Sequence, residues 1–87
     1  MITLRYHENF LVSAKQLSKE HQSKLARLLI LLQGNPFHPL LHTKRLGGKL
    51  AGFLSFRITR DWRVIFQFND PDTIQLLRVR HRKDAYR

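Results

Sequence analysis

The chain has 87 residues, of which 43% are hydrophobic, so it is long enough for one folded domain with a single core. It contains no cysteine, which excludes disulfide bonds within the chain, thiolate metal sites and cysteine nucleophiles. The 16 Lys and Arg residues outnumber 6 Asp and Glu residues, and the formal net charge of +10 predicts binding to a polyanion, most readily RNA.

The first half of the chain predicts one short strand and two helices. Residues 2–6 alternate apolar and polar side chains, as a strand does. Apolar residues then recur at helical spacing over residues 8–18, and again from Ser18 up to Gly34. Ser18 is a suitable N-cap for the second helix, and Gly34 with Pro36 ends it. We therefore expect an αα-hairpin.

A loop over residues 37–48 follows the second helix. It contains one proline and two glycines, and glycine allows a loop to approach a phosphate backbone closely. The basic residues in this loop, or directly after it, are Lys44, Arg45 and Lys49. We assign these three residues to RNA contact rather than to chemistry, because such contacts position a nucleic acid without reading it.

The second half predicts three strands, over residues 52–59, 62–68 and 73–81, in each of which apolar and polar side chains alternate. Short connections between them indicate an antiparallel meander. In the last strand, regular alternation places Arg78 and Arg80 on the same face as the apolar residues Ile74 and Leu76.

One apolar face of this sheet needs a cover, and the helical hairpin is the available one. The predicted fold class is α+β, with the order β-α-α-β-β-β and an antiparallel sheet packed against the αα-hairpin. Residues 1–87 form a single domain. The N-terminus does not resemble a signal peptide, and the longest apolar run, over residues 28–32, is too short for a membrane span. We expect a cytoplasmic protein with no membrane role.

Five short segments, taken together and in their order along the chain, resemble the RelE/ParE superfamily of toxins from bacterial type II toxin–antitoxin systems. The resemblance covers nearly the whole chain and implies a RelE-like fold of the microbial ribonuclease type. The segments that carry it are Asn35-Pro-Phe37, Leu50-Ala-Gly-Phe53, Ser55-Phe-Arg-Ile58, Asp61-Trp-Arg-Val-Ile-Phe66 and Val79-Arg-His-Arg-Lys-Asp-Ala-Tyr86.

The ending from His81 to Tyr86 favours the RelE and YoeB-like branch. That branch implies a metal-independent endoribonuclease, without a cofactor, that cuts mRNA in the ribosome and so inhibits translation. The implied partners are the ribosome, mRNA and a cognate acidic antitoxin, which should lay a helix or strand across the sheet. Two alternatives stay open: a ParE-like poison of DNA gyrase without nuclease activity, and a catalytically inactive basic nucleic-acid binder.

The resemblance also implies roles for four residues. Arg63 matches the arginine that holds the scissile phosphate, although an ion pair with Asp61 is the structural alternative. Arg82 matches a second arginine that stabilises the transition state. His81 matches a histidine that transfers protons, which suits an imidazole. Tyr86 matches a tyrosine that stacks on a base or serves in proton transfer.

Two further arginines, Arg57 and Arg80, are expected to bind RNA. The sequence departs from the superfamily at two points, because Leu54-Ser-Phe56 has no lysine and the loop of Lys44 and Arg45 has no glutamate. These departures leave His81 as the natural candidate for the general base.

Overall fold

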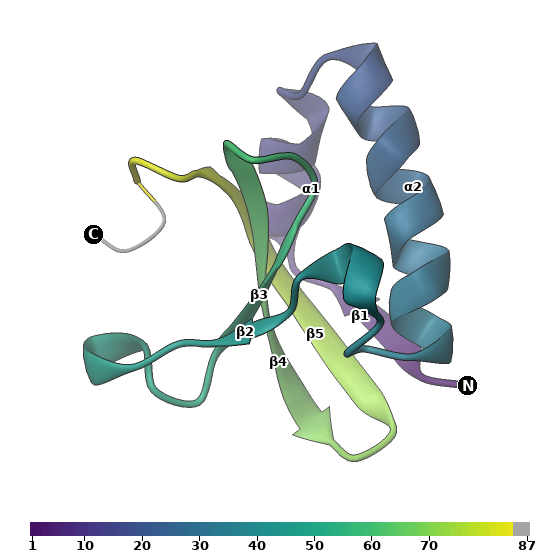
Figure 1. Cartoon of the computed structure of the whole chain (residues 1–87), viewed down its shortest axis with the longest axis vertical. Helices are drawn as coiled ribbons and strands as arrows, with labels where there is room; N and C mark the ends of the chain where they lie inside the picture. Colours follow the sequence, from purple (N-terminus) through teal and green to yellow (C-terminus); the bar gives the residue numbers. More distant parts are fainter. Residues whose placement is uncertain (85–87) are drawn as a thin grey trace.

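The computed structural model describes residues 1–84, in which two helices lie beside one five-stranded sheet (Figure 1). The α+β fold class is therefore confirmed. In chain order the elements are β1 (Thr3–Tyr6), α1 (Glu8–Lys15), α2 (Lys19–Gly34), the short 3₁₀ helix η1 (Pro39–Leu41), β2 (Lys44–Arg45), a second 3₁₀ helix η2 (Gly48–Leu50), β3 (Leu54–Arg57), β4 (Trp62–Asp70) and β5 (Thr73–His81).

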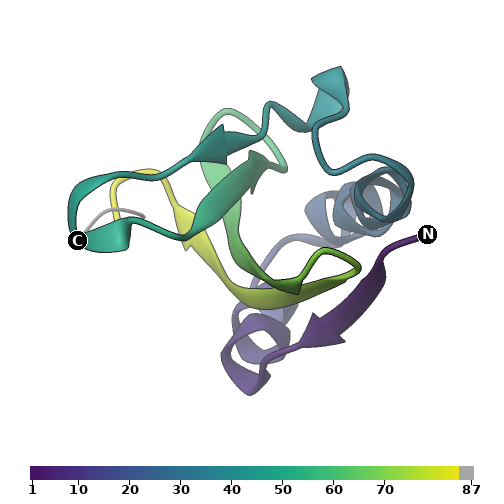
Figure 2. The same cartoon turned by 90° about the horizontal axis from the view of Figure 1, so that it is seen from below.

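The strand order is β1-β5-β4-β3-β2, and Figure 2 shows that the sheet is strongly twisted. The predicted antiparallel meander of β3, β4 and β5 is confirmed. The sheet as a whole is mixed, however, because β1 pairs with β5 in parallel. The expectation of a purely antiparallel sheet was wrong at this strand, since the two helices between β1 and the meander form a crossover, which parallel strands require.

The segment predicted as a loop contains the edge strand β2. Lys44 lies opposite Ser55 and Arg45 opposite Leu54, in an antiparallel pair with β3. Two residues are too few for an alternation pattern to predict a strand. Both side chains are exposed and charged, which discourages another chain from pairing with this edge.

Strand β5 contains an irregularity that changes the faces of its side chains. Leu76 lies opposite Phe66, but the next residue of β4, Ile65, lies opposite Arg78, so Leu77 is an extra residue, a β-bulge. After the bulge, Val79 is buried, and Arg78 and Arg80 lie on the face away from the core. The prediction that these arginines share a face with Leu76 was wrong, because alternation does not continue through a bulge.

The core fills the space between the helices and one face of the sheet. Leu25, Leu28 and Leu32 project from α2, and Phe10 projects from α1. Ser18 caps α2 as predicted, since its hydroxyl accepts a hydrogen bond from the His21 backbone N–H at 3.1 Å. On the sheet, the buried cluster comprises Leu54, Phe56, Val64, Phe66, Ile74, Leu76 and Val79.

Ser13 on α1 completes the hydrogen bonding of β5 beyond the end of β1. Its hydroxyl accepts from the Val79 backbone N–H at 2.8 Å and donates to the Asn9 carbonyl at 2.7 Å. We expect Ser13→Ala to lower the free energy of unfolding by about 1–3 kcal/mol, because it leaves the Val79 amide without a partner. Urea unfolding measures this, with the exposed Ser23→Ala on α2 as the matched control. Equal midpoints for the two variants would contradict this role of Ser13.

Candidate nucleic-acid interface

The face of the sheet that points away from the core carries a cluster of cations. Arg57 on β3 lies directly opposite Arg63 on β4, and Arg63 lies directly opposite Arg80 on β5. Residues in such opposite positions project from the same face, so the three arginines form one row across three strands. The strands of the meander thus bring together Arg57, Arg63 and Arg80, all three of which were predicted to bind or stabilise phosphate.

A second row runs parallel to the first, two residues further along β4. It contains Lys44 on β2, Ser55 on β3, Ile65 on β4 and Arg78 on β5. We call the five basic residues of the two rows the arginine face: Lys44, Arg57, Arg63, Arg78 and Arg80. The sequence did not predict Arg78 as part of the RNA-binding surface, because it is the bulge at Leu77 that brings this side chain to the face away from the core.

Arg63 is the central residue of the arginine face. Its side chain is half-buried, and its Nε is buried without a hydrogen-bond partner. The predicted structural alternative, an ion pair with Asp61, is not formed, because Asp61 pairs with Arg82. A buried guanidinium N–H without an acceptor costs free energy, and an anionic oxygen bound at this point would remove that cost.

Like charges in directly opposite positions destabilise a sheet, so the row of Arg57, Arg63 and Arg80 weakens the fold. The same-face neighbours that the register places two residues along from it are Ser55, Ile65 and Arg78, none of which is acidic. Arg80 is partly stabilised by a long hydrogen bond from Nη1 to the Asp84 carbonyl at 3.5 Å. A planar guanidinium fork suits phosphate, so this face is best matched by a phosphodiester backbone.

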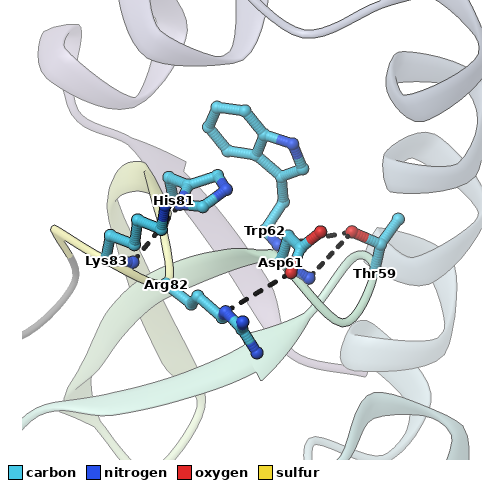
Figure 3. Close-up of polar contacts among 6 residues, drawn as sticks. All are labelled: Thr59, Asp61, Trp62, His81, Arg82 and Lys83. Atoms are coloured by element: carbon cyan, nitrogen blue, oxygen red, sulfur yellow. Dashed lines mark hydrogen bonds and ion pairs between the residues drawn. The ribbon is translucent and has the colours of Figure 1, made fainter.

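His81 and Arg82 lie where β5 ends, beside the turn before β4 (Figure 3). The His81 ring packs edge-on against Trp62, with centroids 5.1 Å apart, and its Nδ1 accepts a hydrogen bond from the Lys83 backbone N–H at 3.3 Å. His81 lies directly across from Trp62 in the β4–β5 register, so the two side chains project from the same face of the sheet. Arg63 follows Trp62 in β4 and projects from the other face. The strands therefore do not bring His81 and Arg63 onto one face.

Arg82 is tied to the β3–β4 turn. Its backbone N–H donates to the Asp61 carbonyl at 2.6 Å, and its Nε lies 3.4 Å from Asp61 Oδ1. Asp61 and Trp62 are in turn held by Thr59, whose hydroxyl accepts from both backbone N–H groups at 3.3 Å (Figure 3). Because both charged side chains are about half exposed, this ion pair contributes little stability. The ion pair orients the Arg82 side chain, which stays about half exposed to solvent.

The remaining residues that were predicted to contact RNA are Arg45, Lys49 and Tyr86. Arg45 stacks its guanidinium over the Phe37 ring, 5.4 Å from the centroid, and Lys49 is exposed in η2. Tyr86 lies outside the described residues. Within residues 1–84, no three His, Cys, Asp or Glu side chains come close enough to hold a metal ion, and no helix is long and apolar enough to cross a membrane.

The chain thus packs a small helical hairpin on one face of a sheet, and the other face carries a row of arginines. A sequence model described as the ParE toxin of type II toxin–antitoxin systems, parDE, matches residues 4–86. The chain belongs to this toxin family. No curated protein matches the toxin by sequence.

Solved structures share the toxin's fold over 92% or more of its length. YafQ from E. coli strain BL21(DE3) superposes with a TM-score of 0.80 at 20% identity, over 100% of both chains. A YoeB/ParE toxin from Agrobacterium tumefaciens gives 0.78 at 19% identity, over 92% of this chain and 98% of that one. The toxin–antitoxin complex RelBE2 from Mycobacterium tuberculosis gives 0.77 at 25% identity, over 93% and 98%. The toxin is thus a member of the RelE/ParE superfamily in fold as well as in sequence.

Proposed function

We propose that this toxin is a ribosome-dependent endoribonuclease that cuts mRNA and inhibits translation. The observation that carries the proposal is the row of Arg57, Arg63 and Arg80, with the unpartnered Nε of Arg63 at its centre. The proposed cut is an attack by a ribose 2′-oxygen on the adjacent phosphorus. The P–O5′ bond breaks as the new P–O2′ bond forms, which yields a cyclic phosphate and a free 5′-hydroxyl.

In this proposal, Arg63 holds the non-bridging oxygens of the phosphorane, where negative charge accumulates. The 2′-hydroxyl loses a proton and the departing 5′-oxygen gains one, so a proton-transfer group must lie near the strand. We assign this group to His81. Because its Nδ1 accepts from the Lys83 backbone N–H, Nε2 carries the proton of the neutral ring, so His81 can take up a proton only at Nδ1 after that hydrogen bond is released. Because the ring lies on the opposite face from Arg63, the end of β5 must also turn when RNA binds. The RNA therefore crosses the row of arginines and leaves past the end of β5, where Arg82 binds the next phosphate. Tyr86, which lies outside the described residues, is assigned to stacking on a base.

Lys44, Arg45, Lys49 and Arg78 extend the basic surface beyond the scissile phosphate, and we assign them to backbone contacts with mRNA or ribosomal RNA. The toxin acts in the cytoplasm, where ribosomes are. It uses no cofactor in this proposal. Its partner is an antitoxin, since similar chains have been crystallised as toxin–antitoxin complexes, among them RelE–RelB from Pyrococcus horikoshii.

Cell-free translation followed by primer extension on the message tests the proposal. We expect the wild-type toxin to produce discrete cuts in ribosome-bound mRNA that are absent with Arg63→Ala. Cleavage that is the same with wild type and with an Arg63→Ala/His81→Ala double variant would refute the assignment of the site.

A second candidate function is a gyrase poison without nuclease activity, which the match to the ParE toxin model favours. A DNA supercoiling assay separates the two candidates. Inhibition of gyrase together with intact mRNA in the translation assay would replace the first proposal by the second.

The position of His81 predicts a graded effect. We expect His81→Gln to slow cleavage by about 10–100-fold, because proton transfer contributes 10²–10⁴-fold and water can replace part of it. Single-turnover cleavage of ribosome-bound mRNA measures the rate. The control is Trp62→Phe, which keeps an aromatic neighbour for His81. A rate unchanged by His81→Gln would leave the histidine with only its packing role.

The arginine face also predicts a strong salt dependence of RNA binding. If Arg57, Arg63, Arg78 and Arg80 each neutralise one phosphate, log K should fall with log[salt] with a slope of roughly −3 for single-stranded RNA. Replacing Arg78 by Gln should reduce the slope by roughly 0.7. Fluorescence anisotropy across a salt series measures the slope, and Lys19→Gln on α2 is the control. A slope that Lys19→Gln changes as much as Arg78→Gln does would contradict the assignment.

A further inference from the structure

A pocket of about 230 Å³ lies between α1 and β5, beside the arginine face. Strand β1 pairs with β5 only as far as Leu76, which lies opposite Tyr6. Beyond that point α1 takes the place of a strand, and the Ser13 hydroxyl accepts a hydrogen bond from the Val79 backbone N–H at 2.8 Å. Because Ser13 and Val79 both line the pocket, this bond fixes its two walls to each other.

The β5 wall of the pocket is cationic. It is lined by Arg78 and Arg80, which project from the arginine face, so the pocket continues that face beyond β5. The row that begins at Arg57 on β3 therefore ends at this pocket. Among the described residues that line the pocket, none carries a carboxylate, so the wall attracts an anionic group without opposition.

The α1 wall of the pocket carries two free amides. It is lined by Asn9, Val12, Ser13 and Gln16, which have the spacing i, i+3, i+4 and i+7 of one helical stripe. The side-chain amides of Asn9 and Gln16 are exposed and make no hydrogen bond to another residue within 1–84. Positions i and i+7 are roughly 10 Å apart along a helix, and Val12, which is 54% exposed, lies between the two amides. The spacing leaves room for a flat ring with one amide at each edge.

We propose that this pocket binds one adenine nucleotide of the RNA beside the cut, and that Asn9 and Gln16 select the base; RNA as the ligand rests on the proposed function. Each amide offers a donor and an acceptor side by side. Adenine has an amino group flanked by two ring acceptors, N1 on its Watson–Crick edge and N7 on its Hoogsteen edge, so it satisfies one amide at each edge. Val12 packs against the face of the ring, and Arg78 and Arg80 bind the adjoining phosphate.

Each of the other bases satisfies at most one of the two amides in this way. Cytosine and uracil offer a donor beside an acceptor on the Watson–Crick edge, but they have a carbon where adenine has N7. Guanine presents two acceptors, O6 and N7, on its Hoogsteen edge. A wrong base thus leaves one amide without a complete set of partners, which is how a polar pocket discriminates.

The position of the pocket agrees with the proposed path of the RNA. Only β5 separates the pocket from β4, the strand of Arg63, and neighbouring strands are ~4.8 Å apart. A nucleotide bound in the pocket is therefore a close neighbour of the phosphate that Arg63 holds. Selection of the base at this point fixes the distance between an adenine and the cut.

Fluorescence anisotropy with the full-length toxin tests the proposal. The probes are two labelled RNA oligonucleotides of about seven nucleotides, one with cytosine at every position and one with a single central adenine. We expect wild type to bind the adenine probe about tenfold more tightly than the cytosine probe at the same salt concentration. The double variant Asn9→Ala/Gln16→Ala should bind the two probes equally, because the phosphate contacts that remain do not read the base.

Two further variants keep the test sharp. Leu11→Ala alters a half-exposed residue of α1 outside the pocket and should keep the tenfold preference. Arg78→Gln should weaken both probes alike, as expected for a phosphate contact. Equal binding of the two probes by wild type would overturn the proposal. A preference that persists in the double variant, or that Leu11→Ala abolishes as well, would do the same.

Primer extension on ribosome-bound mRNA separates this proposal from the proposed function. Wild type should cut at a fixed distance from an adenine, and the double variant should cut without that preference. Selective binding of the adenine probe by a toxin that cuts no message would refute the nuclease and leave the pocket standing. Cleavage that ignores adenine in wild type would refute the pocket and leave the nuclease standing.

Discussion

Replacing Arg63 by Lys is expected to reduce mRNA cleavage by about 100-fold or more while leaving the fold intact. Lysine keeps the positive charge but loses the planar fork that binds two phosphate oxygens, and removing one preorganised donor from a transition state costs 10²–10³-fold. Arg63→Met, which keeps the length of the side chain and loses the charge, should be at least as inactive.

The same substitutions are expected to separate activity from stability. Arg63→Met removes a buried N–H that has no partner and two unfavourable contacts with Arg57 and Arg80. Its midpoint in urea should therefore equal or exceed that of wild type, as measured by circular dichroism. Lys19→Met, which removes one charge from α2, controls for net charge in both assays. A destabilised Arg63→Met variant would mean that the residue serves the fold, and full activity of Arg63→Lys would mean that charge alone suffices.

Truncating Phe66 to Ala should lower the stability of the fold more than any substitution on its surface. Phe66 is 0% exposed and packs against Phe56 and Phe68, with centroids 5.9 and 6.2 Å away. Phe→Ala in a core costs about 3–5 kcal/mol, which is a large part of the stability of a small domain. For a chain of this size we expect Tm to fall by roughly 15 °C or more.

Phe68→Ala on the same strand and face is the matched comparison for Phe66→Ala. Phe68 is only partly buried, so its truncation should lower Tm by clearly less. Differential scanning calorimetry of both variants measures the difference. If the two variants melted together, the core would not be centred on the middle of β4, which is the strand that carries Arg63.

Much of the fold could be predicted because local signals agreed with the tertiary structure. Ser18 caps the start of α2, and the helix ends at Gly34 with Asn35 as its C-cap, so both ends were predicted. Alternation also assigned the faces of β3 correctly, with Phe56 inside and Arg57 outside. These features depend on neighbours in sequence, which a pattern can report.

The missed features depend on pairing between distant segments. A bulge is created by how β5 meets β4, and nothing in the residues around Leu77 marks it. The parallel pairing of β1 depends on where the helical crossover returns the chain. The placement of His81 on the opposite face from Arg63 likewise follows from the register between β4 and β5. The sequence motifs indicate only that both residues match the superfamily's pattern.

The bulge at Leu77 also has a consequence for how the chain finds its native pairing. In the competing alignment of β4 with β5 that lacks the bulge, Arg78 and Arg80 would both point into the apolar layer under the helices. Burial of two unpaired guanidinium groups is prohibitive, so that alignment is disfavoured during folding. The two cations thus favour the native register of β5, a role that does not depend on contact with RNA.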